Sequence, residues 1–218
     1  MNKILKEEFF KKPALEVSEN LLGKILVRKI GQKKLAVKIT ELEIYDGFED
    51  KASHASRGET ERNEIMFEEG GYFYIYLVYG MHWMINIVVG KKDRPSAILL
   101  RDGEVLSSSF HESEKSYSSV LQKTTIRKTG EMIGGKINLD RLARLSFTPQ
   151  NLGGPGKLSK FLKVDKKFNK KKAELKTGLW FEDWGFKIPK NKIKKTSRIG
   201  VHYAGPYWSK KKWRFVVK

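Results

Sequence analysis

Two acidic side chains, Glu41 and Glu43, are separated by one residue in the segment TELEIYDGF. Alternate residues of a β-strand point to the same face, which would place the two carboxyl groups roughly 6–7 Å apart. That spacing suits hydrolysis of a glycosidic bond, or one general base beside a structural acid. Two solvated or ion-paired acids are the plainer alternative in a lysine-rich chain. The apolar neighbours Leu42 and Ile44 favour burial, and a buried acid needs a partner or a chemical role.

The apolar pattern changes phase just before these acids. Val37 and Ile39 belong to an alternating apolar series, but the next apolar residues are Leu42 and Ile44. A slip of one residue predicts a β-bulge near Thr40, and bulges often re-aim side chains beside functional sites. With or without the bulge, acidic groups are pressed against the core.

A tyrosine-rich segment, YFYIYLVYGMH, follows at residues 72–82. Its tyrosines alternate from Tyr72 to Tyr76, so their rings would share one strand face while apolar side chains form a core on the other. Such tyrosines are usually half-buried β-formers, but a row of rings could also stack on nucleic-acid bases. Tyr79 precedes Gly80 at the expected hairpin tip, where a ring has nothing local to pack on. In a basic protein that ring could be a wedge that enters a duplex.

Two further polar residues lie close to this segment. His54 stands in a polar loop at residues 46–63, where a lone histidine is more often a hydrogen-bonding residue than a ligand. The other three histidines are isolated and there is no cysteine, so the sequence predicts no metal site. Asn86 lies on the expected return strand, roughly opposite Tyr76 and among apolar residues. Its amide must find partners there or supply recognition.

The charge balance indicates a polyanionic partner. The 218 residues carry 44 Lys and Arg against 25 Asp and Glu, a formal net charge of +19. Nucleic acid is the favoured partner, with a membrane surface or a merely solvated face as alternatives. No apolar run reaches the roughly 18 residues of a membrane span, and the N-terminal segment, which has acids among its apolar residues, is a poor signal peptide. We therefore expect an intracellular protein, in the cytoplasm or nucleoid if the source is bacterial.

The rest of the chain supplies the elements that position these residues. Turn signals and apolar periodicity predict one domain with an antiparallel meander. The expected helices cover residues 4–10, 14–22, 139–145 and the segment after Pro155, with a surface insertion at 107–123. The expected strands cover residues 25–30, 35–44, 72–79, 83–89, 97–101 and 179–184, followed by a strand, a loop and a closing strand from residue 198 to the C-terminus.

A glycine-rich turn opens the helix after Pro155. Gly156 and Lys157 offer free backbone N–H groups and a positive charge, as in anion-binding helix starts. The turn lacks the spacing of a nucleotide-binding loop. A contact to the phosphate backbone and a plain turn remain equally open, and we expect Arg198 to contact the same backbone.

Taken in order, six motifs are similar to those of the alkyladenine (3-methyladenine) DNA glycosylases. They are ELEIYDGFEDKASH, RNEIMF, YIYLVYGMH, AILLR, GGPGKL and RIGVHYAG, and they span about residues 41–205. The resemblance implies an α+β fold: a single mixed domain with a curved antiparallel β core, flanking helices and a protruding β-hairpin. It also implies that no metal or cofactor is needed.

The resemblance assigns a role to each matching residue. Glu43 would be the general base that activates water against the sugar, and Arg101 would hold that water with it. The flipped base would be clamped by Tyr45, His54 and Tyr76. Tyr79 would fill the gap in the duplex, and Asn86 would disfavour guanine through its exocyclic amine.

These roles predict a monofunctional, monomeric DNA glycosylase acting on double-stranded DNA. Its substrates would be alkylated or deaminated purines such as 3-methyladenine, 7-methylguanine, hypoxanthine and ethenoadenine, released without strand cleavage. A non-enzymatic nucleic-acid binder would use the same tyrosines and lysines without a water site at Glu43. A glycosidase acting on a polyanionic sugar would explain Glu41 and Glu43 but not the hairpin ring.

Overall fold

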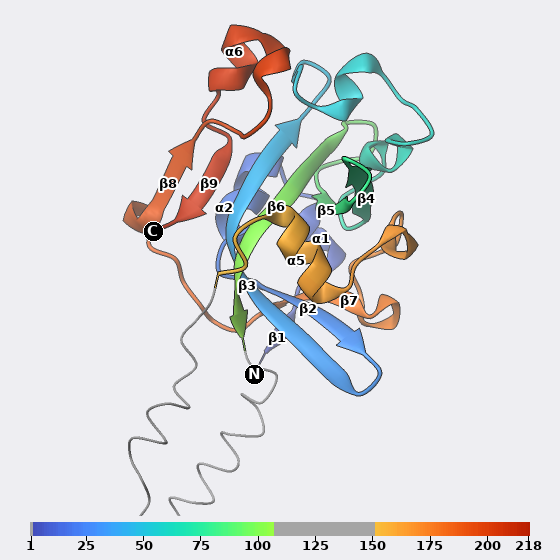
Figure 1. Ribbon diagram of the computed structural model, residues 1–218, viewed down its shortest axis with the longest axis vertical. Coiled ribbons are helices and arrows are strands. Elements are labelled where there is room, and N and C mark those ends of the chain that lie inside the picture. The colour runs from blue at the N-terminus through green and yellow to red at the C-terminus, as the bar shows by residue number, and fades with distance from the viewer. Residues whose placement is uncertain (1, 107–150) are drawn as a thin grey trace, which may run out of the picture.

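The computed structural model describes residues 2–106 and 151–218 (Figure 1). The insertion expected at 107–123 and the helix expected at 139–145 lie outside these residues. The described strands are β1 (Lys3–Ile4), β2 (Ile25–Ile30), β3 (Lys33–Asp46), β4 (Phe73–Val78), β5 (His82–Val88), β6 (Ser96–Leu106), β7 (Leu179–Asp183), β8 (Ile193–Thr196) and β9 (Arg214–Val217). The described helices are α1 (Glu7–Phe10), α2 (Ala14–Leu21), α5 (Pro155–Leu162) and α6 (Gly205–Lys210).

All nine described strands join one antiparallel sheet. The main order is β1-β7-β2-β3-β6-β5-β4, and β9 pairs with both β3 and β8. The sheet is not closed, because this path ends at β1 and β4. Helices α1 and α2 lie behind the sheet in Figure 1, while α5 crosses in front of β5 and β6. The α+β class expected from the sequence is therefore confirmed.

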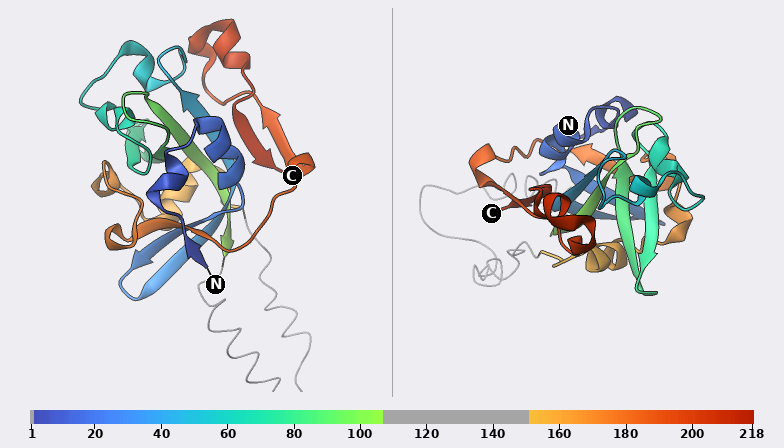
Figure 2. Two further views of the ribbon diagram at one scale, coloured as in Figure 1. Left: turned by 180° about the vertical axis from the view of Figure 1, so that it is seen from behind. Right: turned by 90° about the horizontal axis from the view of Figure 1, so that it is seen from above.

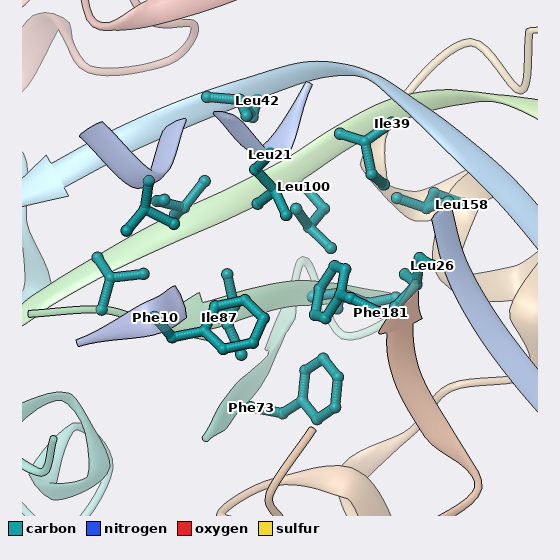
Figure 3. Packing of buried hydrophobic residues seen from close by; sticks show 14 of the residues in the cluster. Phe10, Leu21, Leu26, Ile39, Leu42, Phe73, Ile87, Leu100, Leu158 and Phe181 are labelled. Carbon is teal, nitrogen blue, oxygen red and sulfur yellow. The ribbon is translucent and has the colours of Figure 1, made fainter. Parts of the chain in front are cut away.

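A single large core joins the N-terminal helices, the sheet and α5 (Figure 3). Phe73 and Phe181 stack with ring centroids 5.9 Å apart, and Phe10 packs on Phe181 at 5.4 Å. Leu158 of α5 reaches the same cluster. This core fixes β3 and β4, the two strands that carry the acidic and tyrosine-rich motifs.

The bulge expected near Thr40 is confirmed, and β6 carries a matching irregularity. Ile39 pairs with Gly103 and Glu41 pairs with Asp102, so the register shifts between Ile39 and Glu41. It shifts again directly afterwards, because Leu42 pairs with Leu100 and Arg101 has no partner opposite it on β3. Leu42 continues the core face after the slip. The side chains at 41, 43 and 45 are consequently turned to the opposite face of the sheet.

The β4–β5 hairpin extends beyond the rest of the domain, most clearly in the view from above (Figure 2). At its tip Tyr79 and Gly80 both have positive φ, 52° and 68°, and Met81 N–H donates to the Val78 carbonyl at 3.2 Å. Left-handed turn residues match the right-handed twist of the two strands. Glycine adopts this geometry freely, but a bulky residue such as Tyr79 rarely does.

Both ends of the chain differ from the sequence prediction. The helix expected at residues 4–10 begins only at Glu7, because Lys3–Ile4 pair with β7 as β1. The strand expected from Arg198 is replaced by a 3₁₀ turn at His202–Ala204 and helix α6. Pro206 sits in the first turn of α6, where its fixed φ and missing N–H favour helix initiation. No helix among the described residues is long and apolar enough to cross a membrane.

Candidate active site

Glu43 lies at the centre of the site and is completely buried. Its Oε1 accepts a hydrogen bond from the backbone N–H of Ile199 at 2.7 Å. Its Oε2 accepts from the Tyr45 hydroxyl at 3.0 Å and from Arg101 Nη1 at 3.2 Å. Three donors from three parts of the chain therefore fix the orientation of this carboxyl group.

These contacts leave Glu43 one free acceptor position. A carboxylate offers about four lone-pair sites, two on each oxygen. Among the described residues, the donors to Glu43 occupy two sites on Oε2 and one on Oε1. That leaves one site on Oε1 without a donor among the described residues, and a general base needs such a site for its water.

The surroundings of Glu43 make it a stronger base than an ordinary glutamate. Burial raises the pKa of Glu43, while the Arg101 charge and the bonds from Ile199 and Tyr45 oppose that rise without cancelling it. Burial also holds the pKa of Tyr45 well above its usual value, so Tyr45 stays protonated and donates to Glu43. The arrangement suits proton abstraction from water.

Arg101 is held by a second carboxylate. Glu41 Oε1 accepts from Arg101 Nε and from Arg214 Nε, both at 2.7 Å. Burial raises the pKa of Glu41, but the hydrogen bonds from Arg214 and Arg101 outweigh it and bring the pKa below the usual value. Glu41 is therefore an ionised, structural partner, and the two acids of the motif have different environments.

A pocket that is open to solvent lies next to this carboxyl group. Tyr45 joins the two features, because its ring lines the pocket and its hydroxyl contacts Glu43. The lining residues are Tyr45, Ala52, His54, Met66, Tyr74, Tyr76, Asn86, Ala97 and Tyr203. All four base-pocket residues of the sequence analysis are thus brought to one cavity.

His54 closes one side of the pocket. Its Nδ1 is 2.8 Å from the Tyr74 hydroxyl, and its ring lies edge-on to Tyr76 with centroids 4.7 Å apart. Although the residue as a whole is exposed, burial of its ring among these neighbours and the nearby Arg62 charge lower the pKa of His54 to about 4. His54 is therefore neutral at physiological pH.

The partner of Asn86 on the neighbouring strand differs from the expected one. It pairs with Tyr74, not Tyr76, because the hairpin turns earlier and Val78 pairs with His82. Asn86 Nδ2 donates to the carbonyls of Tyr74 and Met84 at 3.0 and 3.3 Å. Within the described chain these are the bonds of its amide, so Oδ1 is the atom available to a ligand.

Tyr203 belongs to the pocket but was not identified from the sequence. Its hydroxyl donates to the Ala52 carbonyl at 3.0 Å, while 68% of the residue is exposed. The ring therefore stands at the pocket mouth with a fixed orientation. Its position in the motif RIGVHYAG was the available signal. The same motif supplies the Ile199 N–H that holds Glu43, which no side-chain pattern could reveal.

The prediction that Arg198 contacts the DNA backbone is wrong. Its side chain is fully buried and forms a two-pronged ion pair with Asp50, at 2.5 and 2.8 Å. It also donates to the Ile44 carbonyl at 2.7 Å and lies over the Tyr45 ring at 4.8 Å. With its charge satisfied inside the protein, Arg198 instead fixes the chain that presents Ile199 to Glu43.

The hairpin tip and the start of α5 lie side by side. A Cβ added to Gly156 would come within 2.9 Å of His82 Nδ1, so glycine permits this close packing of α5 on β5. Lys157 is exposed and lines a groove together with Met81 and His82. Tyr79 is 87% exposed at the tip. The groove therefore carries an exposed positive charge and lies next to the hairpin tip that bears the exposed ring.

Metal chemistry has no evident ligand set here: the described residues contain no cluster of three or more His, Asp or Glu side chains that could hold a metal ion.

Known proteins of one family match this chain over nearly its whole length. Residues 8–218 match the family model of methylpurine-DNA glycosylase. A protein of Clostridium botulinum is 36% identical over 99% of this chain and 96% of its own length. One of Methanocella arvoryzae is 36% identical over 99% and 92%, and one of Natranaerobius thermophilus is 32% identical over 97% and 93%. All three are provisionally described as 3-methyladenine DNA glycosylases. The chain therefore belongs to the methylpurine-DNA glycosylase family.

Proposed function

We propose that the protein flips alkylated or deaminated purines out of duplex DNA and hydrolyses their N-glycosidic bond with a water activated by Glu43. The observation that carries this proposal is a buried carboxyl group with one free acceptor site, joined through Tyr45 to a tyrosine-lined pocket. A water held on Glu43 Oε1 would attack the sugar carbon as the base departs. Arg101 helps to orient the carboxylate that holds it.

The pocket chemistry suits a purine that carries a positive charge. Tyrosine faces attract cations, by about 0.5–2 kcal/mol per contact. His54 is neutral at physiological pH and adds no repulsion, since its pKa is about 4. The N-glycosidic bond of an alkylated purine is already weak, so one positioned water suffices and binding supplies the discrimination. Among the residues that the structure describes, the pocket lining includes no lysine that could form a Schiff base, which supports base release without strand cleavage.

Extrusion of a base costs a few kcal/mol, least at a damaged pair. Tyr79 would offset this cost by filling the gap in the duplex. The residue is 87% exposed. Its backbone φ is 52°, a geometry that a bulky residue adopts at some energetic cost. Lys157, which shares a groove with Met81 and His82, and the net charge of +19 would supply salt-dependent affinity for the phosphate backbone.

Replacing Tyr79 by Ala should weaken capture of the extrahelical base by roughly tenfold, about the loss of one base–aromatic stack. Binding to an undamaged duplex, which depends on salt-sensitive phosphate contacts, should change far less. Fluorescence of a duplex with one ethenoadenine, which brightens on unstacking, measures capture. Tyr79→Phe keeps the ring and should behave like the wild type. Equal losses of capture and of undamaged-duplex binding in Tyr79→Ala would argue against a wedge.

The purified protein should release 3-methyladenine from methylated duplex DNA and leave abasic sites in unbroken strands. Chromatography of the released bases and a gel before and after alkali treatment measure the two outcomes. A folded, DNA-bound protein that releases no base would refute the enzyme proposal and favour a non-enzymatic binder. Strand breaks before alkali would instead refute monofunctional chemistry.

A further inference from the structure

We propose that Glu41 is a positioning residue: it holds the Arg101 guanidinium so that only one N–H reaches Glu43, and thereby keeps one acceptor site of Glu43 free for the attacking water. This inference rests on the proposed role of Glu43. It assigns a function to the second acid of the Glu-Leu-Glu motif, which the proposed hydrolysis does not itself use.

The geometry divides one guanidinium between two carboxylates. Arg101 Nε donates to Glu41 at 2.7 Å, whereas Nη1 donates to Glu43 at the longer distance of 3.2 Å. Arg101 is 13% exposed at its side chain, Glu41 14% and Glu43 0%, so water screens these contacts little. The shorter contact anchors the guanidinium on Glu41, and Glu43 receives a single bond.

A free guanidinium would behave differently. Its planar array of N–H groups matches the two oxygens of a carboxylate and commonly forms paired, parallel hydrogen bonds. Without Glu41, Arg101 would turn toward Glu43 as its remaining carboxylate and add a second bond. That bond would take the last acceptor site on Oε1, which the proposed hydrolysis needs for water. Glu41 prevents this by occupying Nε.

Register shifts in the pairing of β3 with β6 create this arrangement. The two successive register shifts lie on either side of Glu41, and Arg101 is the residue of β6 that has no partner opposite it on β3. Without these shifts, a regular ladder would pair residues on the two strands one to one. The bulges bring Glu41, Glu43 and Arg101 to one face, which is the face opposite the main core. Such irregularities re-aim side chains beside functional sites.

Glu41 also has a second contact, with Arg214 of β9, whose charge lowers the pKa of Glu43. Arg214 of β9 donates to the same Oε1 and to the Thr196 hydroxyl at 3.5 Å, but no hydrogen bond joins it to Glu43 within the described residues. This contact ties β9 to β3. A structural role for Glu41 would therefore depend on Arg214, whereas a positioning role would depend on Arg101, and the two can be separated by mutation.

The test is a double-mutant cycle. For each protein, the measured quantities are the single-turnover rate of base release from methylated duplex DNA, the dissociation constant for that duplex and the melting temperature. Glu41→Ala should slow release roughly 30-fold, a part of the 10²–10⁴-fold contribution of a general base, and change duplex affinity less than threefold. Glu41→Gln retains an oxygen for Arg101 Nε and should recover most of the rate. Arg214→Gln removes a charge that lowers the pKa of Glu43, so it is assayed at a pH at which Glu43 is ionised, and there it should stay within about threefold of the wild type. In an Arg101→Met background, Glu41→Ala should have no further effect, because residues that act through one another are not additive.

The pH profile supplies a readout that a structural role would not move. Within the described residues, the charged and titratable groups that face Glu43 are Arg101, Tyr45, Tyr76 and Arg214, with Glu41 behind Arg101. Glu41→Ala removes a nearby negative charge and strengthens the Arg101 contact, and both changes favour ionised Glu43. The acid limb of the rate profile should therefore move to lower pH. NMR titration of the Glu43 carboxyl carbon should show the same shift without any substrate.

Three results would overturn the proposal: Glu41→Ala at the wild-type rate, an equal loss of rate in Arg214→Gln, or an undiminished effect of Glu41→Ala in the Arg101→Met background. The NMR titration distinguishes a failure of the positioning role of Glu41 from a failure of the proposed hydrolytic function. If the wild type releases no base, the hydrolytic role of Glu43 fails. An unshifted Glu43 titration in Glu41→Ala would still refute the positioning role of Glu41, and a downward shift would support it.

Discussion

A Glu43→Gln protein should release damaged purines about 10²–10⁴-fold more slowly than the wild type, the usual contribution of a general base. Glutamine has nearly the same shape as glutamate but cannot accept a proton from water. Its amide nitrogen must also face one of three donors, from Ile199, Tyr45 or Arg101, so a modest loss of stability should accompany the loss of rate. Single-turnover release measures the first effect, and the melting temperature measures the second.

Binding of a damaged duplex should survive this substitution, because the pocket rings and the hairpin are unchanged. Glu16→Gln is a suitable control: Glu16 lies on α2, and its side chain is 47% exposed in an ion pair with Lys12. The control should match the wild type in rate, affinity and stability. Undiminished turnover by Glu43→Gln would remove Glu43 as the base. In the wild type, the rate should fall with decreasing pH through a pKa above that of an ordinary glutamate, because burial raises the pKa of Glu43.

Replacing Arg198 by Met should lower the free energy of unfolding by about 3–5 kcal/mol, as expected when one partner of a buried ion pair is removed. Asp50 would be left fully buried with an unpaired charge, and the Ile44 carbonyl would lose its donor. Urea denaturation monitored by tryptophan fluorescence measures this loss. Lys12→Ala removes an exposed ion pair, whose side chains are 52% and 47% exposed, and should change the same free energy by less than about 1 kcal/mol.

The double variant Asp50→Leu with Arg198→Met removes both charges and should be more stable than Arg198→Met alone. It should still release bases slowly, because Ile199 and Tyr45 lose the support that Arg198 gives them. An Arg198→Met protein with wild-type stability would contradict the burial of this pair. A double variant less stable than the single one would show that Arg198 acts through its packing and backbone contacts more than through Asp50.

The sequence by itself determined the central strands and which of their side chains share a face. Alternation placed Tyr74 and Tyr76 on one strand face, and the phase slip after Ile39 located the bulge that turns Glu43 away from the core. An aromatic residue before a glycine marked the exposed hairpin tip. These features are local: strand periodicity and turn preferences depend on neighbouring residues, and they are read directly from the order of the chain.

Only the tertiary structure decided which polar groups meet. Ile199 N–H reaches Glu43 across 156 positions, and Arg198 finds Asp50 across 148. A charged residue gives no local sign of burial, because its counter-charge arrives from a distant segment, so Arg198 was wrongly predicted to face DNA. Asn86 was placed opposite the wrong tyrosine because the turn centre sets the register of the whole hairpin. Periodicity specifies the face on which a side chain lies, whereas packing specifies its partner.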